Sequence, residues 1–558
     1  MTMPTVTDLN PALIRERSSY PKAAYDAPLK PALKYEWKFE DRFGNRHGRL
    51  FYQLSRQSGV SANAQWVDVF KRDVHQSEFF AGTDFTVTAI ADEDSFTIYR
   101  VFPPDDPVEI FRQIGKLELH GLSADGQFIL IQSARNGNWF RPELVVMGLH
   151  GDVLARLSEF AGVTGCWAGA WAPVPGDQRI VFLHEATGFF QPAIWSPFEA
   201  RTENVSTNLE GEVFATWDRS GHALILKRCL NGRSDLHRLS FDTRKIETIQ
   251  PLDGTVWRHE LDSENRVIGI WTSSHRYAES FREHERFPTA GFKPSVPLKP
   301  WLFRRIAGVP CFVIGDAQSN GRQWTIFDGY GSYAYHHSDG YNHKIQPLVD
   351  HGFQVVMVNT RGCNGFGRAW RESTQGNLGF TELEDLRRVR AALITEGLVD
   401  GNRTIITGDS WGGYMTLLAM GTQPDIWRMG MAGEPVGDFE HIGMEASPII
   451  WAATRSQFGG DPQTDAAVYR KASPLTYVNA IRAPVLMVAG KYDLLCPPKQ
   501  NIAFAEALRA RGSECEIHIF EGAHGAPDRE ERIRQNIIML EFLVRHCRAF
   551  DTKCAGPE

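Results

Sequence analysis

The sequence predicts two structural parts, an all-β propeller followed by a mainly parallel sheet with helices on both faces. Three observations support this division. Residues 35–285 contain short β-rich runs between turns that recur at a nearly constant spacing, which is typical of propellers. After about residue 310, apolar runs alternate with stretches of helical spacing, which is typical of parallel α/β sheets. A Gly-x-Ser-x-Gly motif lies in this second part.

The bulk properties are those of an ordinary globular protein. With 558 residues, the chain is too long for a single hydrophobic core. A net charge of −7 and a hydrophobic content of 42% favour neither nucleic acid nor an anionic membrane as a partner. There is no apolar run long enough to span a membrane, and the first residues lack the pattern of a secretory leader. The eight cysteines have no paired spacing, which predicts reduced thiols in the cytoplasm and no metal site.

We divide the chain into an N-terminal segment (1–30), a propeller (31–290) and a catalytic domain (291–558). Within the propeller, four similar turns lie 50, 45 and 44 residues apart, at Gly126, Gly176, Gly221 and Asn265. A β-rich repeat of this length predicts four-stranded blades, and the period alone gives about five or six of them. A β-sandwich with coincidental turns is the alternative. Several prolines then indicate a linker around residues 286–310.

The catalytic domain begins with two predicted buried strands, residues 324–327 and 353–358. A helix face follows, formed by Leu383, Leu386, Val389, Leu393 and Ile394. A final helix is predicted to cover one face of the sheet with Ile533, Ile537, Leu540 and Leu543. Residues 549–558 are expected to form a loose tail.

The Gly-x-Ser-x-Gly motif runs from Gly408 to Gly412, with Ser410 at its centre. A β-branched run precedes it and good helix formers follow it, which predicts a strand, a sharp turn and a helix. Small residues in such a turn expose the serine as a nucleophile. The backbone N–H of Trp411, at the start of the helix, is then expected to stabilise an oxyanion.

A nucleophilic serine needs a base and an acid that orients the base, and in α/β-hydrolases these follow in the order Ser, Asp, His. Asp493 comes after a predicted buried strand, and His524 lies in a glycine-flanked loop after an alternating strand. Asp438 and His518 are the rival acid and base. We prefer Asp493 for its place in this order, and His518 lies inside a strand, where a structural role is usual. Cys496 has no base nearby in sequence and is expected to be inert.

Four sequence blocks make a family resemblance specific: residues 328–333, 359–367, the serine block and 473–477. In this order they resemble the catalytic domain of the prolyl oligopeptidase family of serine peptidases. The similarity covers about residues 300–548 and is greatest to the acylaminoacyl-peptidase and dipeptidyl-peptidase-like branches. The resemblance implies an α/β-hydrolase fold, a propeller of seven blades, a triad of Ser410, Asp493 and His524, and no cofactor. It also implies that the Tyr330 hydroxyl joins the oxyanion hole.

Departures from the family pattern leave the substrate subsites open. The acylaminoacyl branch usually has His-Gly-Gly-Pro where this chain has Asp-Gly-Tyr-Gly, and Leu495 occupies a position where an arginine is frequent. Glu434 is an acid where the family commonly has a small residue. It is a candidate to bind a substrate ammonium group, with Val436 and Phe439 as further candidate substrate-binding residues. An internal ion pair between Glu434 and Arg361 is the favoured alternative.

We therefore expect a serine peptidase that hydrolyses amide bonds of short peptides or peptide-like molecules. A tailoring esterase, isopeptidase or peptide cyclase with the same triad is an alternative. A propeller binding scaffold with an inactive hydrolase domain is another, against which the intact triad argues. Peptides are the expected partners, and a homo-oligomer is left open.

Overall fold

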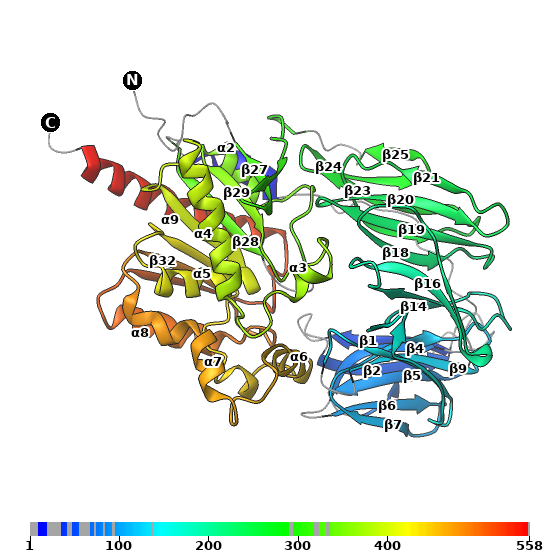
Figure 1. Ribbon diagram of the computed structural model, residues 1–558. Coiled ribbons are helices and arrows are strands. Elements are labelled where there is room, and N and C mark those ends of the chain that lie inside the picture. The colour runs from blue at the N-terminus through cyan, green and yellow to red at the C-terminus, as the bar shows by residue number, and fades with distance from the viewer. Residues whose placement is uncertain are drawn as a thin grey trace.

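Figure 1 shows the computed structural model, with the antiparallel sheets of residues 35–288 (blue to green) on the right and the α/β part on the left. Among the described residues, none of the helices combines the length and the hydropathy needed to cross a membrane. The structure describes residues 9–18, 35–41, 47–54, 67–71, 74–81, 84–91, 95–134, 138–288, 294–315, 323–330 and 335–555.

The α/β part is built on one eight-stranded sheet. Its strands are β26 (Leu302–Ile306), β27 (Val309–Ile314), β28 (Thr325–Tyr330), β29 (Gln354–Asn359), β30 (Thr404–Asp409), β31 (Gly430–Gly433), β32 (Val485–Gly490) and β33 (Cys515–Phe520). They follow the order β26-β27-β29-β28-β30-β31-β32-β33. The pairs β26–β27 and β27–β29 are antiparallel, and all other neighbours are parallel. The sheet is therefore mainly parallel, as predicted.

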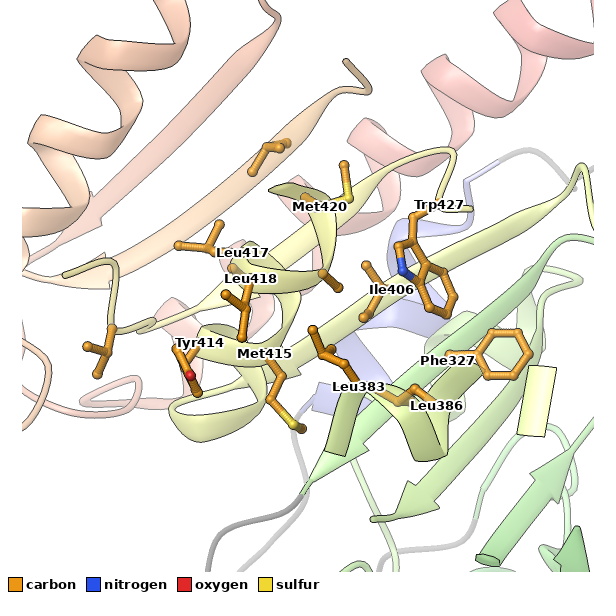
Figure 2. Packing of buried hydrophobic residues seen from close by; sticks show 14 of the residues in the cluster. Phe327, Leu383, Leu386, Ile406, Tyr414, Met415, Leu417, Leu418, Met420 and Trp427 are labelled. Carbon is orange, nitrogen blue, oxygen red and sulfur yellow. The ribbon is translucent and has the colours of Figure 1, made fainter. Parts of the chain in front are cut away.

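Helices cover both faces of this sheet. The helices of this part of the chain are α2 (Ile345–Asp350), α3 (Arg368–Glu372), α4 (Phe380–Thr395), α5 (Trp411–Thr422), α6 (Pro448–Phe458), α7 (Ala466–Ala472), α8 (Pro498–Arg509) and α9 (Arg529–Ala555). Figure 2 shows one core, in which Leu386 of α4 lies beside Phe327 of β28 and Met415 of α5 belongs to the same cluster. The neighbouring residue Ile326 points to the other face and packs in a second core with Leu540 of α9. This alternation explains why the strands are apolar on both faces.

Two expectations about the ends of the α/β part are wrong. The linker ends by residue 301, because β26 and β27 occupy residues 302–314. Pro310 fits within β27 because it lies outside the segment paired with β29, where its missing N–H is tolerated. Residues 549–555 are not loose but continue α9: the Phe550 ring is 5.3 Å from that of Trp324, and Asp551 pairs with Arg403 at 3.0 Å.

Four antiparallel sheets of four strands each follow the predicted repeat within the described part of the chain. Each predicted turn joins the first two strands of one sheet, and its residue has a positive φ, from +62° at Asn265 to +84° at Gly176. Glycine and asparagine adopt this conformation most readily, which explains the repeat. The strands are β8 (Leu117–Leu122), β9 (Phe128–Ser133), β10 (Glu143–Gly148), β11 (Val153–Leu157), β14 (Trp167–Trp171), β15 (Ile180–His184), β16 (Gln191–Ser196), β17 (Arg201–Asn204), β18 (Glu212–Trp217), β19 (Ala223–Leu230), β20 (Arg233–Ser240), β21 (Ile246–Gln250), β22 (Thr255–Leu261), β23 (Val267–Ser273), β24 (Arg276–Arg282) and β25 (Glu285–Pro288).

The strands before this repeat form one seven-stranded sheet, in which β3 pairs with β2 beside the path β1-β2-β4-β5-β6-β7. A short pair, β12 (Glu159–Phe160) and β13 (Val163–Thr164), lies between two of the repeated sheets in the chain. The seven strands are β1 (Tyr35–Asp41), β2 (His47–Leu54), β3 (Val67–Asp68), β4 (Val74–Ala81), β5 (Thr86–Ala91), β6 (Ser95–Val101) and β7 (Val108–Ile114).

Buried polar contacts join the antiparallel sheets to the α/β part. Arg371 of α3 makes a bidentate ion pair with Glu185, with both N–O distances at 2.6 Å. The carboxylate of Glu212 in β18 accepts the N–H groups of Gly365 and Gly367. These contacts hold the sheets beside the loop that follows β29, at the edge from which the catalytic candidates emerge.

The N-terminal helix α1 (Pro11–Ser18) packs on the α/β part. Ile14 is buried in the core shared with α9. The fully buried Arg17 pairs with Asp350 at 2.7 Å and contacts the Tyr277 hydroxyl at 3.3 Å. Outside residues 9–18, the predicted segment 1–30 lies beyond the described residues.

Candidate active site

The strand, turn and helix predicted around Ser410 are present between β30 and α5. Ser410 has φ 56° and ψ −113°, a left-handed conformation that is costly for a residue with a side chain. Its N–H donates to the Gly433 carbonyl oxygen at 2.8 Å. A Cβ at Gly408 would lie 2.6 Å from the Gly412 backbone, and one at Gly412 would lie 2.6 Å from the Gly329 oxygen. Close packing of strand against helix therefore requires the glycines of the motif.

Asp493 and His524 lie together at the same edge of the sheet. Nδ1 of His524 is 2.8 Å from Oδ2 of Asp493, whose side chain is fully buried. The other oxygen, Oδ1, accepts the backbone N–H groups of Leu495 at 2.8 Å and Cys496 at 2.9 Å. Burial disfavours the charged imidazole, but the hydrogen bond to Asp493 and the nearby carboxylates outweigh it, so the pKa of His524 is raised. Because Nδ1 is engaged, Nε2 is the nitrogen that can accept a proton.

Cys496 lies next to Ser410 and the pair of Asp493 and His524. Its thiol, the Asp493 carboxylate and the His524 ring have atoms within 4.8 Å of one another. Burial raises the pKa of the thiol well above its ordinary value, and the neighbouring Ser410 hydroxyl partly opposes this effect. Cys496 therefore stays a neutral thiol, and it links Ser410 to the same cluster. Within this group, Asp493 and His524 are hydrogen-bonded to each other.

The rival residues take part in other pairs. Nε2 of His518 lies 2.9 Å from Oε1 of Glu531 in α9. Oδ2 of Asp438 lies 2.6 Å from Nδ1 of His441. Each rival thus has a structural partner of its own.

Tyr330 is the last residue of β28, and its ring packs beside the first turn of α5. A Cβ at Gly412 would lie 3.8 Å from Cδ2 of Tyr330, and the ring centroids of Tyr330 and Tyr335 are 5.1 Å apart. Burial raises the pKa of Tyr330 well above its ordinary value, and Cys496 is among the neighbouring groups that add to the effect. The hydroxyl is therefore a neutral hydrogen-bond donor. Residues 331–333 of the predicted oxyanion segment lie outside the described residues.

The candidate substrate-binding residues Val436 and Phe439 are buried, with exposures of 5% and 2%. Both belong to the core that α5 shares with the sheet. The Phe439 ring is 6.2 Å from Trp411 and 4.9 Å from Tyr414. A substrate would reach these two side chains only over a small area, because packing against the core already occupies them.

The predicted ion pair between Glu434 and Arg361 is wrong. Arg361 instead pairs with Asp385 of α4 at 2.9 Å, because α4 lies beside the loop that carries the arginine. Glu434 directly follows β31 and is largely buried. Its Oε1 accepts the N–H of Gly525 at 2.6 Å, and its Oε2 lies 3.9 Å from Nδ1 of His524. The glutamate thus faces the loop that carries His524.

A cavity of about 290 Å³ adjoins this loop on the side of α9. One wall carries an ion pair that sequence reasoning missed, in which Nζ of Lys344 lies 2.6 Å from Oδ1 of Asp409. The sequence shows only that an acid, Asp409, precedes Ser410 in the motif. Its partner Lys344 lies 65 residues earlier in the chain, so the sequence does not indicate the ion pair. Other residues of the wall include Glu434 and Arg532.

Comparison with known proteins agrees with the sequence blocks. Residues 339–549 match the prolyl oligopeptidase family, so the predicted resemblance is confirmed for this part of the chain. Acylamino-acid-releasing enzyme 2 of Oryza sativa subsp. japonica is 30% identical over 181 residues, which are 31% of this chain and 23% of that protein. The matching part thus spans about a quarter of this curated relative.

Two solved structures share the fold over most of both chains. Pyrococcus horikoshii acylaminoacyl peptidase has a TM-score of 0.64 and 16% identity, covering 89% of this chain and 86% of that one. A puromycin-hydrolyzing peptidase of Mycobacterium tuberculosis has a TM-score of 0.67 and 16% identity, covering 97% of each chain. At these identities the likeness concerns the fold, which is an α/β-hydrolase domain combined with a β-propeller, as predicted. Seven blades stays a prediction.

Proposed function

We propose that the chain is a serine peptidase of the prolyl oligopeptidase type, which hydrolyses amide bonds of short peptides or peptide-like molecules. The observation that carries this proposal is the 2.8 Å contact between His524 and Asp493 next to a serine held in a left-handed turn. Unrelated serine hydrolases use this combination of groups. The family match of residues 339–549 and the acylamino-acid-releasing relatives support the same chemistry.

In the proposed reaction, the Ser410 oxygen attacks the substrate carbonyl carbon while Nε2 of His524 accepts the serine proton. Asp493 holds Nδ1–H and stabilises the imidazolium ion. The N–H of Trp411 and the hydroxyl of Tyr330 donate hydrogen bonds to the oxyanion. His524 then protonates the leaving amine, and water hydrolyses the acyl-enzyme by the same steps.

Labelling with a fluorophosphonate probe tests the nucleophile. We expect the probe to modify Ser410, and we expect no labelling of the folded Ser410→Ala variant. His518→Ala is the matched control, because His518 pairs with Glu531 and its loss should leave the labelling rate unchanged. Labelling at another residue, or none, would refute the assignment. Product masses from a peptide library then separate hydrolysis from the acyl transfer expected of a tailoring esterase, isopeptidase or peptide cyclase.

We also propose finer features of the molecule: a propeller over residues 31–290 with seven blades, a catalytic domain over residues 291–558, and a cytoplasmic location. The repeated four-stranded sheets support the propeller. Within the described part of the chain, seven cysteines have free thiols, and this supports a reducing compartment. An experimental structure would count the blades, and mass spectrometry under non-reducing conditions would report the state of the thiols.

A further inference from the structure

Glu434 places a second carboxylate beside His524. Its Oε1 accepts the N–H of Gly525, the residue after the histidine, at 2.6 Å. Its Oε2 lies 3.9 Å from Nδ1 of His524. Nδ1 therefore faces two acids, Asp493 at hydrogen-bond distance and Glu434 within the range of an ion pair.

The backbone turn at Glu434 keeps the carboxylate beside His524. Glu434 has φ 44°, a left-handed conformation that is rare for residues other than glycine, and it directly precedes Pro435. Its N–H donates to the Val488 carbonyl oxygen at 2.6 Å, which ties the turn to β32. The preceding residue, Gly433, accepts the N–H of Ser410. One strained turn thus contacts both the nucleophile and the histidine loop, and strain of this kind concentrates at functional sites.

We propose that Glu434 is a positioning residue that fixes the loop of His524 and stabilises its imidazolium form as a second carboxylate. The inference rests on the proposed role of His524 as the general base. When His524 accepts the serine proton, its positive charge lies beside both Asp493 and Glu434. In a partly enclosed site an ionic interaction over 3.9 Å is stronger than in water. This role replaces substrate recognition and the pair with Arg361 as the reason for an acid at this position.

The titration of Glu434 agrees with this role. Burial raises the pKa of Glu434 to about 7, while the charge of His524 opposes that effect. The negative charge of Glu434 raises the pKa of His524, and the positive charge of His524 lowers the pKa of Glu434, so the two protonations are coupled. The other charged or titratable groups around it are Asp409, Lys344, Asp493 and Cys496, with His343 and Arg532 across the cavity.

Glu434→Gln is the informative variant, because its amide oxygen still accepts the Gly525 N–H while the charge is removed. We expect kcat to fall on the order of tenfold with little change in KM. The acid limb of kcat/KM should move to lower pH, because neutral His524 persists to lower pH without the second carboxylate. Glu434→Ala should lose more kcat, because it also loses the hydrogen bond to the loop.

Glu531→Gln is the matched control. It removes a carboxylate that lies 2.9 Å from Nε2 of His518, the histidine rejected as the base. It should change neither kcat nor the acid limb of kcat/KM. A Glu434→Gln enzyme with reduced kcat and an unshifted acid limb would assign Glu434 a purely structural role and overturn the proposal.

An NMR titration of the His524 ring separates this inference from the proposed peptidase activity, because it needs no turnover. In a Ser410→Ala background, Glu434→Gln should lower the imidazole pKa. An unchanged imidazole pKa would refute the role of Glu434 even if the protein is an active peptidase. A lowered imidazole pKa in a protein that hydrolyses no peptide would support the interaction with His524 and refute the proposed function alone.

Discussion

Replacement of Asp493 by asparagine should abolish the base function of His524 while leaving its ring in place. In the structure, Oδ1 of Asp493 accepts two backbone N–H groups, and Oδ2 faces Nδ1 of His524. An asparagine must keep its carbonyl oxygen at the Oδ1 site, because an NH₂ group there would face two donors. Its NH₂ group then replaces Oδ2 and donates to Nδ1. The imidazole is forced to carry its proton on Nε2, which can no longer accept the proton of Ser410.

The expected loss in kcat is on the order of 10⁴, the effect of a wrong tautomer in a serine hydrolase. This corresponds to about 5 kcal/mol of transition-state stabilisation. Stability should change much less, because the two backbone hydrogen bonds and the side-chain volume are kept. Steady-state hydrolysis of a chromogenic peptide amide measures kcat, and a thermal melt checks the fold.

Asp493→Ala is the informative comparison, because it removes the acid without placing a donor against Nδ1. With Glu434 still 3.9 Å from that nitrogen, Asp493→Ala should retain more kcat than Asp493→Asn. An asparagine variant that kept more than about a tenth of the wild-type kcat would show that the tautomer argument and the choice of Asp493 are wrong.

Three further predictions follow from the fold and the site. Tyr330→Phe should lower kcat by roughly 10²–10³ with little change in KM, since it removes an oxyanion donor; an unchanged kcat would leave the oxyanion hole to backbone N–H groups. Arg371→Leu should lower the free energy of unfolding by about 3–5 kcal/mol, because it leaves the buried carboxylate of Glu185 without its cationic partner. Denaturant titration measures this loss, and a double variant with Glu185→Leu should recover much of it. Short peptides should be cleaved and folded proteins spared, because sheets of the first part pack beside the catalytic edge; rapid digestion of a native folded protein would indicate an open site.

Features with a local cause could be predicted from the sequence. The turns from Gly126 to Asn265 recur because each needs a left-handed residue, and that requirement is visible in the residue type. The glycines around Ser410 are fixed by close packing of β30, α5 and their neighbours. Asp493 and His524 could be predicted to meet because the carboxyl ends of parallel strands share one edge of a sheet.

Features that depend on a distant partner could not be predicted. Opposite charge is the only signal in the sequence for a pair between Glu434 and Arg361, but α4 brings Asp385 to the arginine. The neighbourhood of Cys496 depends on how the loop after β32 turns back toward the serine, for which the spacing of residues holds no signal. Residues 549–555 look like a polar tail until Phe550 is seen against the ring of Trp324.

The position of α1 has a consequence for how the protein is made. The ribosome synthesises Arg17 early, but its partners Tyr277 and Asp350 emerge much later, on the order of tens of seconds at typical rates of translation. A helix of eight residues is marginal alone, so α1 cannot hold its shape during that interval. Arg15 also pairs with Glu530 of α9, near the end of the chain. Helix α1 leaves the ribosome before these partners and docks only after them, and a chain stalled before α9 would present the Ile14 side of α1 and the apolar face of the sheet to chaperones.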